Sequence, residues 1–282
     1  MSAVRGKVAV VTGAGSGIGR ALALELAARG ARVAISDVDE QGLAGTAAVL
    51  AQRGAEAHTA PLDVADREAV LAYAATVAEH FGVVHQIYNN AGIAFSRSVL
   101  ESDWADYERV LAVNLWGVIH GTKAFLPHLI ASGDGHVVNV SSLNGIMAQP
   151  GMSAYCTSKF GVRGFTETLR AELLGAGHPV GVTVVHPGGV KTNIATAAFE
   201  RGKQQRAVTE AEERRMRTYN EKLLKLPAEQ AAKIIVDGVE AGRPRVLVGT
   251  DAKLVDAFVR LLPRFYPALL VRFGGKVLGS AG

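Results

Sequence analysis

The sequence predicts an α/β protein built on a doubly wound, seven-stranded parallel sheet with helices on both faces. Short apolar runs typical of buried strands alternate with helical segments from the first residues onward. The 282 residues are enough for one large domain with a sizeable core, and neither an internal repeat nor a linker divides them. We therefore expect a single sheet domain over residues 1–250 and an apolar, basic extension over residues 251–282.

Strands and helices are expected to alternate along the chain. The strands are predicted at residues 7–11, 32–36, 56–62, 83–89, 136–140, 180–185 and 245–248. The helices are predicted at residues 18–29, 40–53, 67–81, 102–121, 153–174 and 227–240, and the fourth is expected to continue, after a break, to residue 130. Gly30 ends the first helix, and Pro227 stands near the first turn of the last helix, where its missing N–H costs little.

Composition and charge exclude several classes of protein. Hydrophobic residues make up 49% of the chain and charged residues 20%, which is ordinary for a globular protein. The single cysteine, Cys156, excludes an internal disulfide, and no signal-peptide core or transmembrane run is visible, so we expect a cytoplasmic protein. The net charge of +4 is uneven, because segments 193–226 and 251–282 each carry +3. A nucleic-acid binder would show a denser basic face, and no cluster has metal-ligand spacing, so neither partner is expected.

A glycine-rich turn stands between the first strand and the first helix. It reads Thr12-Gly13-Ala14-Gly15-Ser16-Gly17-Ile18-Gly19. Gly13 and Gly17 would let the backbone turn tightly and approach a pyrophosphate, and Gly19 would let the helix pack close to the sheet. The helix N-terminus would then offer N–H groups, beside Ser16 and Ile18, to the phosphates. A glycine-rich turn without a ligand is the alternative interpretation.

Asp37 ends the second predicted strand, 18 residues after Gly19. A carboxylate there can accept hydrogen bonds from both ribose hydroxyls of an adenosine, and it would repel a 2′-phosphate. Position 38 is Val and position 16 is Ser, so neither supplies a cation for that phosphate. We therefore predict NAD(H) rather than NADP(H). The alternative is a solvated Asp that opens the next helix, although Asp39 could serve as its N-cap instead.

Two more turns follow predicted strands and fall on the same sheet edge, where open α/β sheets bind ligands. Asp63 and Val64 follow the third strand, and Asp63 could bond an adenine amino group. Asn90, Ala91 and Gly92 follow the fourth strand and could pass flat against the adenosine. Taken alone, both segments are better explained as ordinary turns.

Tyr155 and Lys159 stand four residues apart in a predicted helix and so share one helix face. A phenol has an ordinary pKa of about 10, and a nearby ammonium lowers it. The pair can therefore act as a tuned general acid/base. The same spacing also occurs by chance on helix surfaces, so its weight depends on the residues around it.

Three further features accompany this pair. Ser142 follows the fifth strand, 13 residues before Tyr155, where a loop could bring its hydroxyl beside the phenol. Asn114 lies within a predicted helix, where its propensity is poor. His186-Pro187-Gly188 ends the sixth strand, with Thr192 shortly after it. We interpret His186 as a packing residue, because Tyr155 already fills the acid/base role.

The ordered set of these motifs resembles the short-chain dehydrogenase/reductase superfamily over about residues 5–250. The glycine spacing, Thr-Gly-x-x-x-Gly-x-Gly, is similar to that of its single-domain branch, whose fold is of the Rossmann type. The resemblance implies that Tyr155 is the general acid/base and that Ser142 holds the substrate oxygen. It also implies that Lys159 binds the nicotinamide ribose and lowers the pKa of Tyr155, while Asn114 keeps a water in line with Lys159. The residues implied to flank the nicotinamide are Pro187, Gly188, Val190 and Thr192.

The substrate is expected to meet a largely apolar wall. Two loops supply Ile93, Phe95, Leu143, Ile146, Met147 and Met152, and segment 193–226 is expected to form a lid over them. We therefore favour oxidation and reduction between a hydrophobic secondary alcohol and its ketone, although several of these side chains could simply pack the core. The alternatives are an NADPH-dependent 3-oxoacyl thioester reductase and a catalytically silent nucleotide-binding regulatory protein. Asp37 argues against the first, and the intact set of catalytic residues argues against the second.

The extension beyond the last strand is unusual for simpler members of this superfamily. Pro263 and Pro267 limit it to short helical pieces. We favour packing onto the body or onto a sister subunit in a homo-oligomer such as a dimer or tetramer. Peripheral membrane contact through the apolar and basic residues of this tail is the less favoured alternative.

Overall fold

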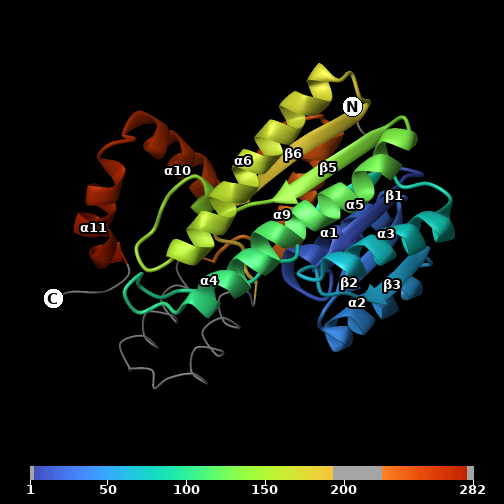
Figure 1. The fold of residues 1–282 in the computed structure, drawn as a ribbon, viewed down its shortest axis with the longest axis horizontal. Helices are drawn as coiled ribbons and strands as arrows, with labels where there is room; N and C mark the ends of the chain where they lie inside the picture. Colours follow the sequence, from blue (N-terminus) through green and yellow to red (C-terminus); the bar gives the residue numbers. More distant parts are fainter. Residues whose placement is uncertain (1–2, 193–223, 278–282) are drawn as a thin grey trace.

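The computed structural model describes residues 3–192 and 224–277. It confirms the predicted sheet of seven parallel strands, in the order β3-β2-β1-β4-β5-β6-β7 (Figure 1). The chain starts at the centre with β1, moves outward to β3, and then crosses back to β4 on the other side of β1. The strands are β1 (Val8–Thr12), β2 (Arg32–Asp37), β3 (Ala57–Pro61), β4 (Gln86–Asn89), β5 (Gly135–Val140), β6 (Val180–Pro187) and β7 (Arg245–Val248).

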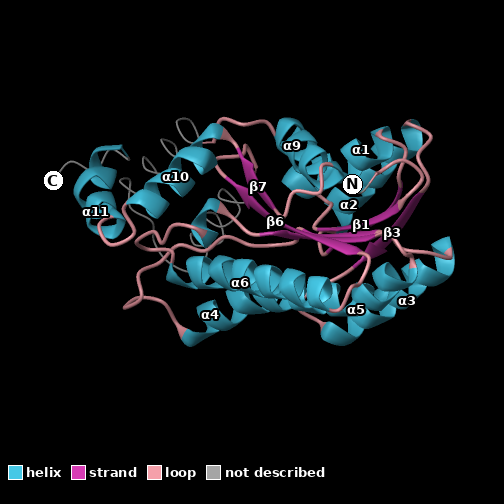
Figure 2. Ribbon diagram, turned by 90° about the horizontal axis from the view of Figure 1, so that it is seen from above, coloured by secondary structure: helices cyan, strands magenta, loops and turns pink. Residues whose placement is uncertain are grey.

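Helices cover both faces of the sheet, as predicted (Figure 2). One face carries α1 (Gly17–Ala28), α2 (Glu40–Gln52) and α9 (Ala228–Glu240). The other carries α3 (Arg67–Phe81), α4 (Trp104–Leu111), α5 (Gly117–Ala131) and α6 (Ser153–Gly175). The tail forms α10 (Thr250–Leu261) and α11 (Tyr266–Val277), which extend away from the sheet beyond β7. The break between α10 and α11 falls at Pro263, as the prolines predict.

The helices on both faces explain why the central strands β1 and β5, unlike the edge strand β3, are buried along their whole length. All five residues of β1 are buried. Because successive side chains of a strand point to opposite faces, Val8 and Val10 join the core beneath α3 and α5, while Ala9 and Val11 join the core beneath α1 and α9. The core therefore lies in two layers, one on each side of the sheet.

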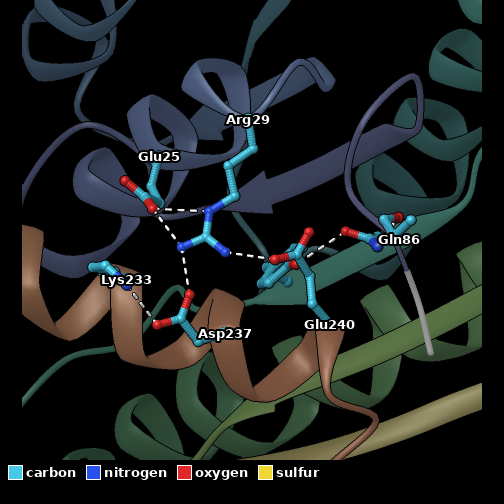
Figure 3. Close-up of polar contacts among 8 residues, drawn as sticks. Glu25, Arg29, Gln86, Lys233, Asp237 and Glu240 are labelled. Atoms are coloured by element: carbon cyan, nitrogen blue, oxygen red, sulfur yellow. Dashed lines mark hydrogen bonds and ion pairs between the residues drawn. The ribbon is translucent and has the colours of Figure 1, made fainter.

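A charged cluster joins α1 to α9, which lie on the same face of the sheet (Figure 3). Arg29, at the end of α1, contacts Glu25 at 2.6 Å, Asp237 at 2.7 Å and Glu240 at 2.6 Å. One guanidinium thus links its own helix to two turns of α9. The cluster fixes α9 beside α1, although the two helices are more than 200 residues apart in the sequence.

No helix among the described residues is both long and apolar enough to span a bilayer.

Candidate active site

The predicted site residues gather at one edge of the sheet, where the parallel strands end. The glycine turn follows β1, Asp37 ends β2, and Asn90 follows β4. Ser142 follows β5, and Pro187 ends β6. Topology alone brings these segments together, because parallel strands have their carboxyl ends on the same side.

The glycine turn is braced against the segment that follows β4. Gly13 has a φ of +67°, and a Cβ added to it would lie 2.7 Å from the Cα of Ala91, so neither the conformation nor the space admits a side chain. The hydroxyl of Thr12 accepts hydrogen bonds from the backbone N–H groups of Asn90 and Ala91, each at 3.1 Å. The Asn90 side chain donates in return to the carbonyls of Thr12 and Gly13. Asn90 therefore shapes the turn, a role that the sequence did not indicate.

The Asp37 carboxylate lies directly against this turn. Its Oδ2 accepts a hydrogen bond from the Gly15 N–H at 2.8 Å, and its Oδ1 accepts one from the Asp39 N–H at 2.9 Å. Asp39 is the N-cap of α2, as anticipated, since it accepts from the Gly42 N–H at 3.0 Å. The neighbouring cation, Arg20, donates instead to Thr46 and to the Gly42 carbonyl, which joins α1 to α2.

Asn114 sits in a π-helical turn, η1 (Ala112–Trp116), between α4 and α5. Its side chain is fully buried, accepts a hydrogen bond from the Ile93 N–H at 2.8 Å and donates to the Ile93 carbonyl at 2.9 Å. It also donates to the Ser158 hydroxyl at 3.2 Å. These partners account for an Asn in a helix, and the irregular turn is a common device at functional sites.

Lys159 converges on the same point from α6. A Cβ added to Gly92 would lie 3.1 Å from Oδ1 of Asn114 and 3.4 Å from Nζ of Lys159, so the two side chains are neighbours there. The Nζ donates to the Val140 carbonyl at 3.1 Å and lies 5.8 Å from the centre of the Tyr155 ring. Lys159 is 3% exposed, and this burial lowers its pKa to about 8. The ammonium can therefore lose a proton close to neutral pH.

The strand-end serines are held by their neighbours. Ser142 begins the short helix η2 (Leu143–Gly145), where its hydroxyl accepts from the Asn144 N–H at 3.1 Å. Its carbonyl accepts from Nδ1 of His186 at 2.8 Å. Burial lowers the pKa of His186 to about 4, so the ring stays neutral. His186 is thus a packing residue, as interpreted from the sequence, and it also fixes the Ser142 backbone. The neighbouring Ser141 donates to the Lys159 carbonyl at 2.8 Å.

The Pro187-Gly188 turn is held by the tail. Oδ2 of Asp251, in the first turn of α10, accepts from the Gly189 N–H at 2.6 Å. The Gly188 N–H donates to the Val248 carbonyl at 2.9 Å, and a Cβ on Gly188 would overlap the Asp251 carboxylate. Sequence reasoning missed Asp251, because nothing local links it to a turn 62 residues away.

Several other predicted contacts have local roles in the structure. Val190 is buried in the core, and the methyl of Thr192 lies against Gly17. Asp63 accepts from the Ala65 N–H at 2.9 Å, and Val64 packs on Gly117. Ser16 is the exposed N-cap of α1, and Ile18 packs partly against the core. Their contacts to a cofactor stay predictions.

The predicted substrate wall divides into two sets. Phe95, Ile146 and Met147 are buried, so they pack the interior, as the alternative interpretation allowed. Ile93, Leu143 and Met152 remain partly exposed. The backbone of Ile93 is hydrogen-bonded to Asn114, Leu143 follows Ser142 in the chain, and Met152 contacts the side chain of Asn144. Most of the predicted lid, residues 193–223, lies outside the described residues. Within the part of the chain that is described, no group of three His, Cys, Asp or Glu side chains could hold a metal ion.

Comparison with known proteins identifies the family. A family model described as short chain dehydrogenase matches residues 7–203. The Mycobacterium tuberculosis protein named "Putative oxidoreductase SadH" is 54% identical over 271 residues, which cover 96% of each chain. Estradiol 17-beta-dehydrogenase 11 of Homo sapiens is 36% identical over 170 residues, covering 60% of this chain and 57% of that protein. A short chain dehydrogenase/reductase from Burkholderia phymatum, solved in complex with NAD, has a TM-score of 0.85 and 34% identity, covering 95% of this chain and 97% of that one. The chain therefore belongs to the short-chain dehydrogenase family.

Proposed function

We propose that this protein is an NAD(H)-dependent oxidoreductase that interconverts a hydrophobic secondary alcohol and its ketone, with Tyr155 as general acid/base. The observation that carries the proposal is the convergence of Lys159 and Asn114 at Gly92, with the Tyr155 ring beside the ammonium. Burial of the Lys159 ammonium without an acidic partner destabilises the fold. A role in proton chemistry explains why a lysine occupies this position.

The residues at the sheet edge fit a dinucleotide. Gly13 and Gly17 have a positive φ, a conformation that favours glycine. Because neither carries a side chain, a pyrophosphate could approach the backbone of this turn. The Asp37 carboxylate, fixed by Gly15 and Asp39, would accept the ribose hydroxyls of the adenosine. When bound, the nicotinamide would supply hydride transfer.

The side chains of this protein would handle the proton and the substrate oxygen. Tyr155 would exchange a proton with that oxygen at its Oη, and the Ser142 hydroxyl would hold the oxygen in place. The Lys159 ammonium favours the phenolate of Tyr155 and is itself able to titrate near neutral pH. Asn114 fixes Ile93 and Ser158, and so fixes the turn of α6 that carries Lys159.

Partly exposed apolar side chains support a hydrophobic substrate. Ile93 is bonded to Asn114 through its backbone, Leu143 follows Ser142, and Met152 contacts Asn144. A screen of NAD-linked and NADP-linked oxidation over secondary alcohols graded by size and polarity tests this proposal. We expect kcat/KM to rise with apolar size and to be higher with NAD. A preference for sugars or phosphorylated alcohols would contradict the substrate class.

Replacing Asp37 with Ala is expected to weaken NAD binding by about tenfold and to relax discrimination against NADP. The variant loses the acceptor for the ribose hydroxyls and the charge that repels a 2′-phosphate. The ratio of kcat/KM for the two cofactors measures the effect. Asp39→Ala is the matched control, because it removes a nearby carboxylate that caps α2 and should leave the cofactor ratio unchanged. Wild-type preference for NADP would contradict the assignment.

Replacing Asp251 with Ala is expected to weaken NADH binding about fivefold, because the Gly189 N–H loses its acceptor and the Pro187-Gly188 turn loosens. Fluorescence titration with NADH measures the affinity. Asp256→Asn, in the same helix, weakens the ion pair with Arg245 and serves as the control for a general loss of stability. Equal losses of NADH affinity in both variants would show that the turn has no specific dependence on Asp251.

A further inference from the structure

The α10–α11 pair presents apolar and basic side chains to solvent. We define the tail surface as the exposed large apolar and basic residues of these two helices and of the turn between them: Lys253, Leu254, Arg260, Leu261, Leu262, Arg264, Phe265, Val271 and Arg272. Leu254 is 72% exposed, Leu261 78%, Phe265 64% and Val271 70%. Large aliphatic and aromatic side chains grouped with this exposure mark an interaction site more often than chance.

The arrangement along α10 is ordered. Leu254 and Leu261 are seven residues apart and lie on one face, and Lys253 and Arg260 form a parallel row beside them. The inner side of the same helix packs on the body, where Ala252 is fully buried and Asp256 pairs with Arg245 at 2.6 Å. One side of α10 therefore packs against the body, while the side that carries Leu254 and Leu261 is exposed to solvent.

Charge indicates the partner. Between residues 250 and 272, all of which the structure describes, the two acids are engaged within the protein: Asp251 with the Gly189 N–H, and Asp256 with Arg245 and Arg260. The acids therefore leave no negative charge on the tail surface, while Lys253 and Arg264 are exposed and basic. A binding partner for this surface must have an apolar interior and an anionic boundary with water. An anionic lipid bilayer has both. A second copy of this chain paired about a two-fold axis would bring like charges together.

We propose that the tail surface binds anionic lipid membranes peripherally. The apolar residues would enter the boundary between headgroups and acyl chains, and the exposed Lys253 and Arg264 would meet the lipid phosphates. The surface adjoins residues 143–152, one of the two loops predicted to meet the substrate, because the Tyr266 hydroxyl at the start of α11 accepts from the Ala148 N–H at 3.2 Å. Membrane binding would therefore place the substrate side of the molecule near the bilayer. The binding itself does not depend on the proposed reaction.

Vesicle flotation of the full chain tests the proposal without turnover. The probes are vesicles of phosphatidylcholine mixed with phosphatidylglycerol, and vesicles of phosphatidylcholine alone. We expect wild type to float with the anionic vesicles and to release at high salt. Leu261→Ser/Phe265→Ser should abolish flotation, and Lys253→Glu/Arg264→Glu should weaken it at least about 20-fold, since each basic residue near an anionic surface strengthens binding about fivefold.

Matched variants control for general effects. Arg53→Glu/Arg243→Glu changes the net charge by the same amount at exposed sites on other parts of the chain, and Leu174→Ser removes an exposed leucine at the far end of α6. Both should float like wild type. The proposal is overturned if wild type stays unbound on anionic vesicles or if these controls lose as much binding as the tail variants. It is equally overturned if the tail variants change only the mass measured by light scattering, because a sister subunit would then cover the surface.

Discussion

Replacing Tyr155 with Phe is expected to lower kcat by about 10²–10⁴-fold while NADH still binds with wild-type affinity. The substitution removes one hydroxyl and keeps the ring that lies 5.8 Å from the Lys159 ammonium. The cofactor segments at Gly13 and Asp37 belong to other strand ends, so their geometry should persist. Steady-state kinetics together with an NADH titration separates the two effects.

Tyr107→Phe is the control for this experiment. Its hydroxyl bonds to Ser153 at 2.7 Å, at the start of the same helix that carries Tyr155. Removal of that hydroxyl should cost about 1 kcal/mol of unfolding free energy and leave kcat within about twofold of wild type. If Tyr155→Phe retains more than about a tenth of the wild-type kcat, Tyr155 is not the general acid/base.

The sheet and the site edge could be predicted because their signals are local. Most strands are largely apolar runs of four to eight residues, although the edge strand β3 is not, and the motif residues stand where the strands stop. In a parallel sheet the ends of all runs meet at one edge, so sequence order is enough to bring Asp37, Asn90 and Ser142 together. The Tyr155–Lys159 spacing likewise needs nothing beyond the helix repeat.

Contacts that close over long stretches of chain could not be predicted. Asp251 reaches Gly189 across 62 residues, and Asn90 donates to Gly13 across 77. Such pairs are set by how α10 and the strand ends pack, and no periodicity reports that packing. The π-helical turn at Asn114 is similar, because an unfavourable Asn signals an irregularity without saying that Ile93 and Ser158 will satisfy it.

In the tail, too, the helices could be predicted from the sequence but their packing could not. Its prolines predicted short helices, and α10 ends before Pro263. Which side of α10 the body covers was not predictable, since both sides carry apolar residues. One side of α10 meets the body through Ala252 and Asp256, while Leu254 and Leu261 remain exposed, and the expected contact with a sister subunit stays a prediction.

Lys159→Met is expected to abolish activity and, at the same time, to stabilise the apoprotein. Burial lowers the pKa of Lys159 from 10.5 to about 8, so the folded state binds this proton more weakly than the unfolded state. Below pH 8 both states are protonated, and the folded protein carries the full desolvation cost of about 3 kcal/mol. Stability therefore rises as the pH increases from 8 to 10.5, where the folded state no longer carries the charge.

Methionine removes that charge at every pH. Loss of the hydrogen bond to the Val140 carbonyl cancels about 1 kcal/mol of this gain in stability. The free energy of unfolding of the variant at pH 7 should therefore exceed that of wild type by about 1–3 kcal/mol. The difference should shrink toward pH 10, which urea unfolding at the two pH values measures. Lys123→Met, at an exposed position on α5, should change neither stability nor activity appreciably. A destabilised Lys159→Met protein would mean that the ammonium serves the fold. A stabilised but inactive one would mean that the protein keeps a buried charge for its chemistry and at the expense of its stability.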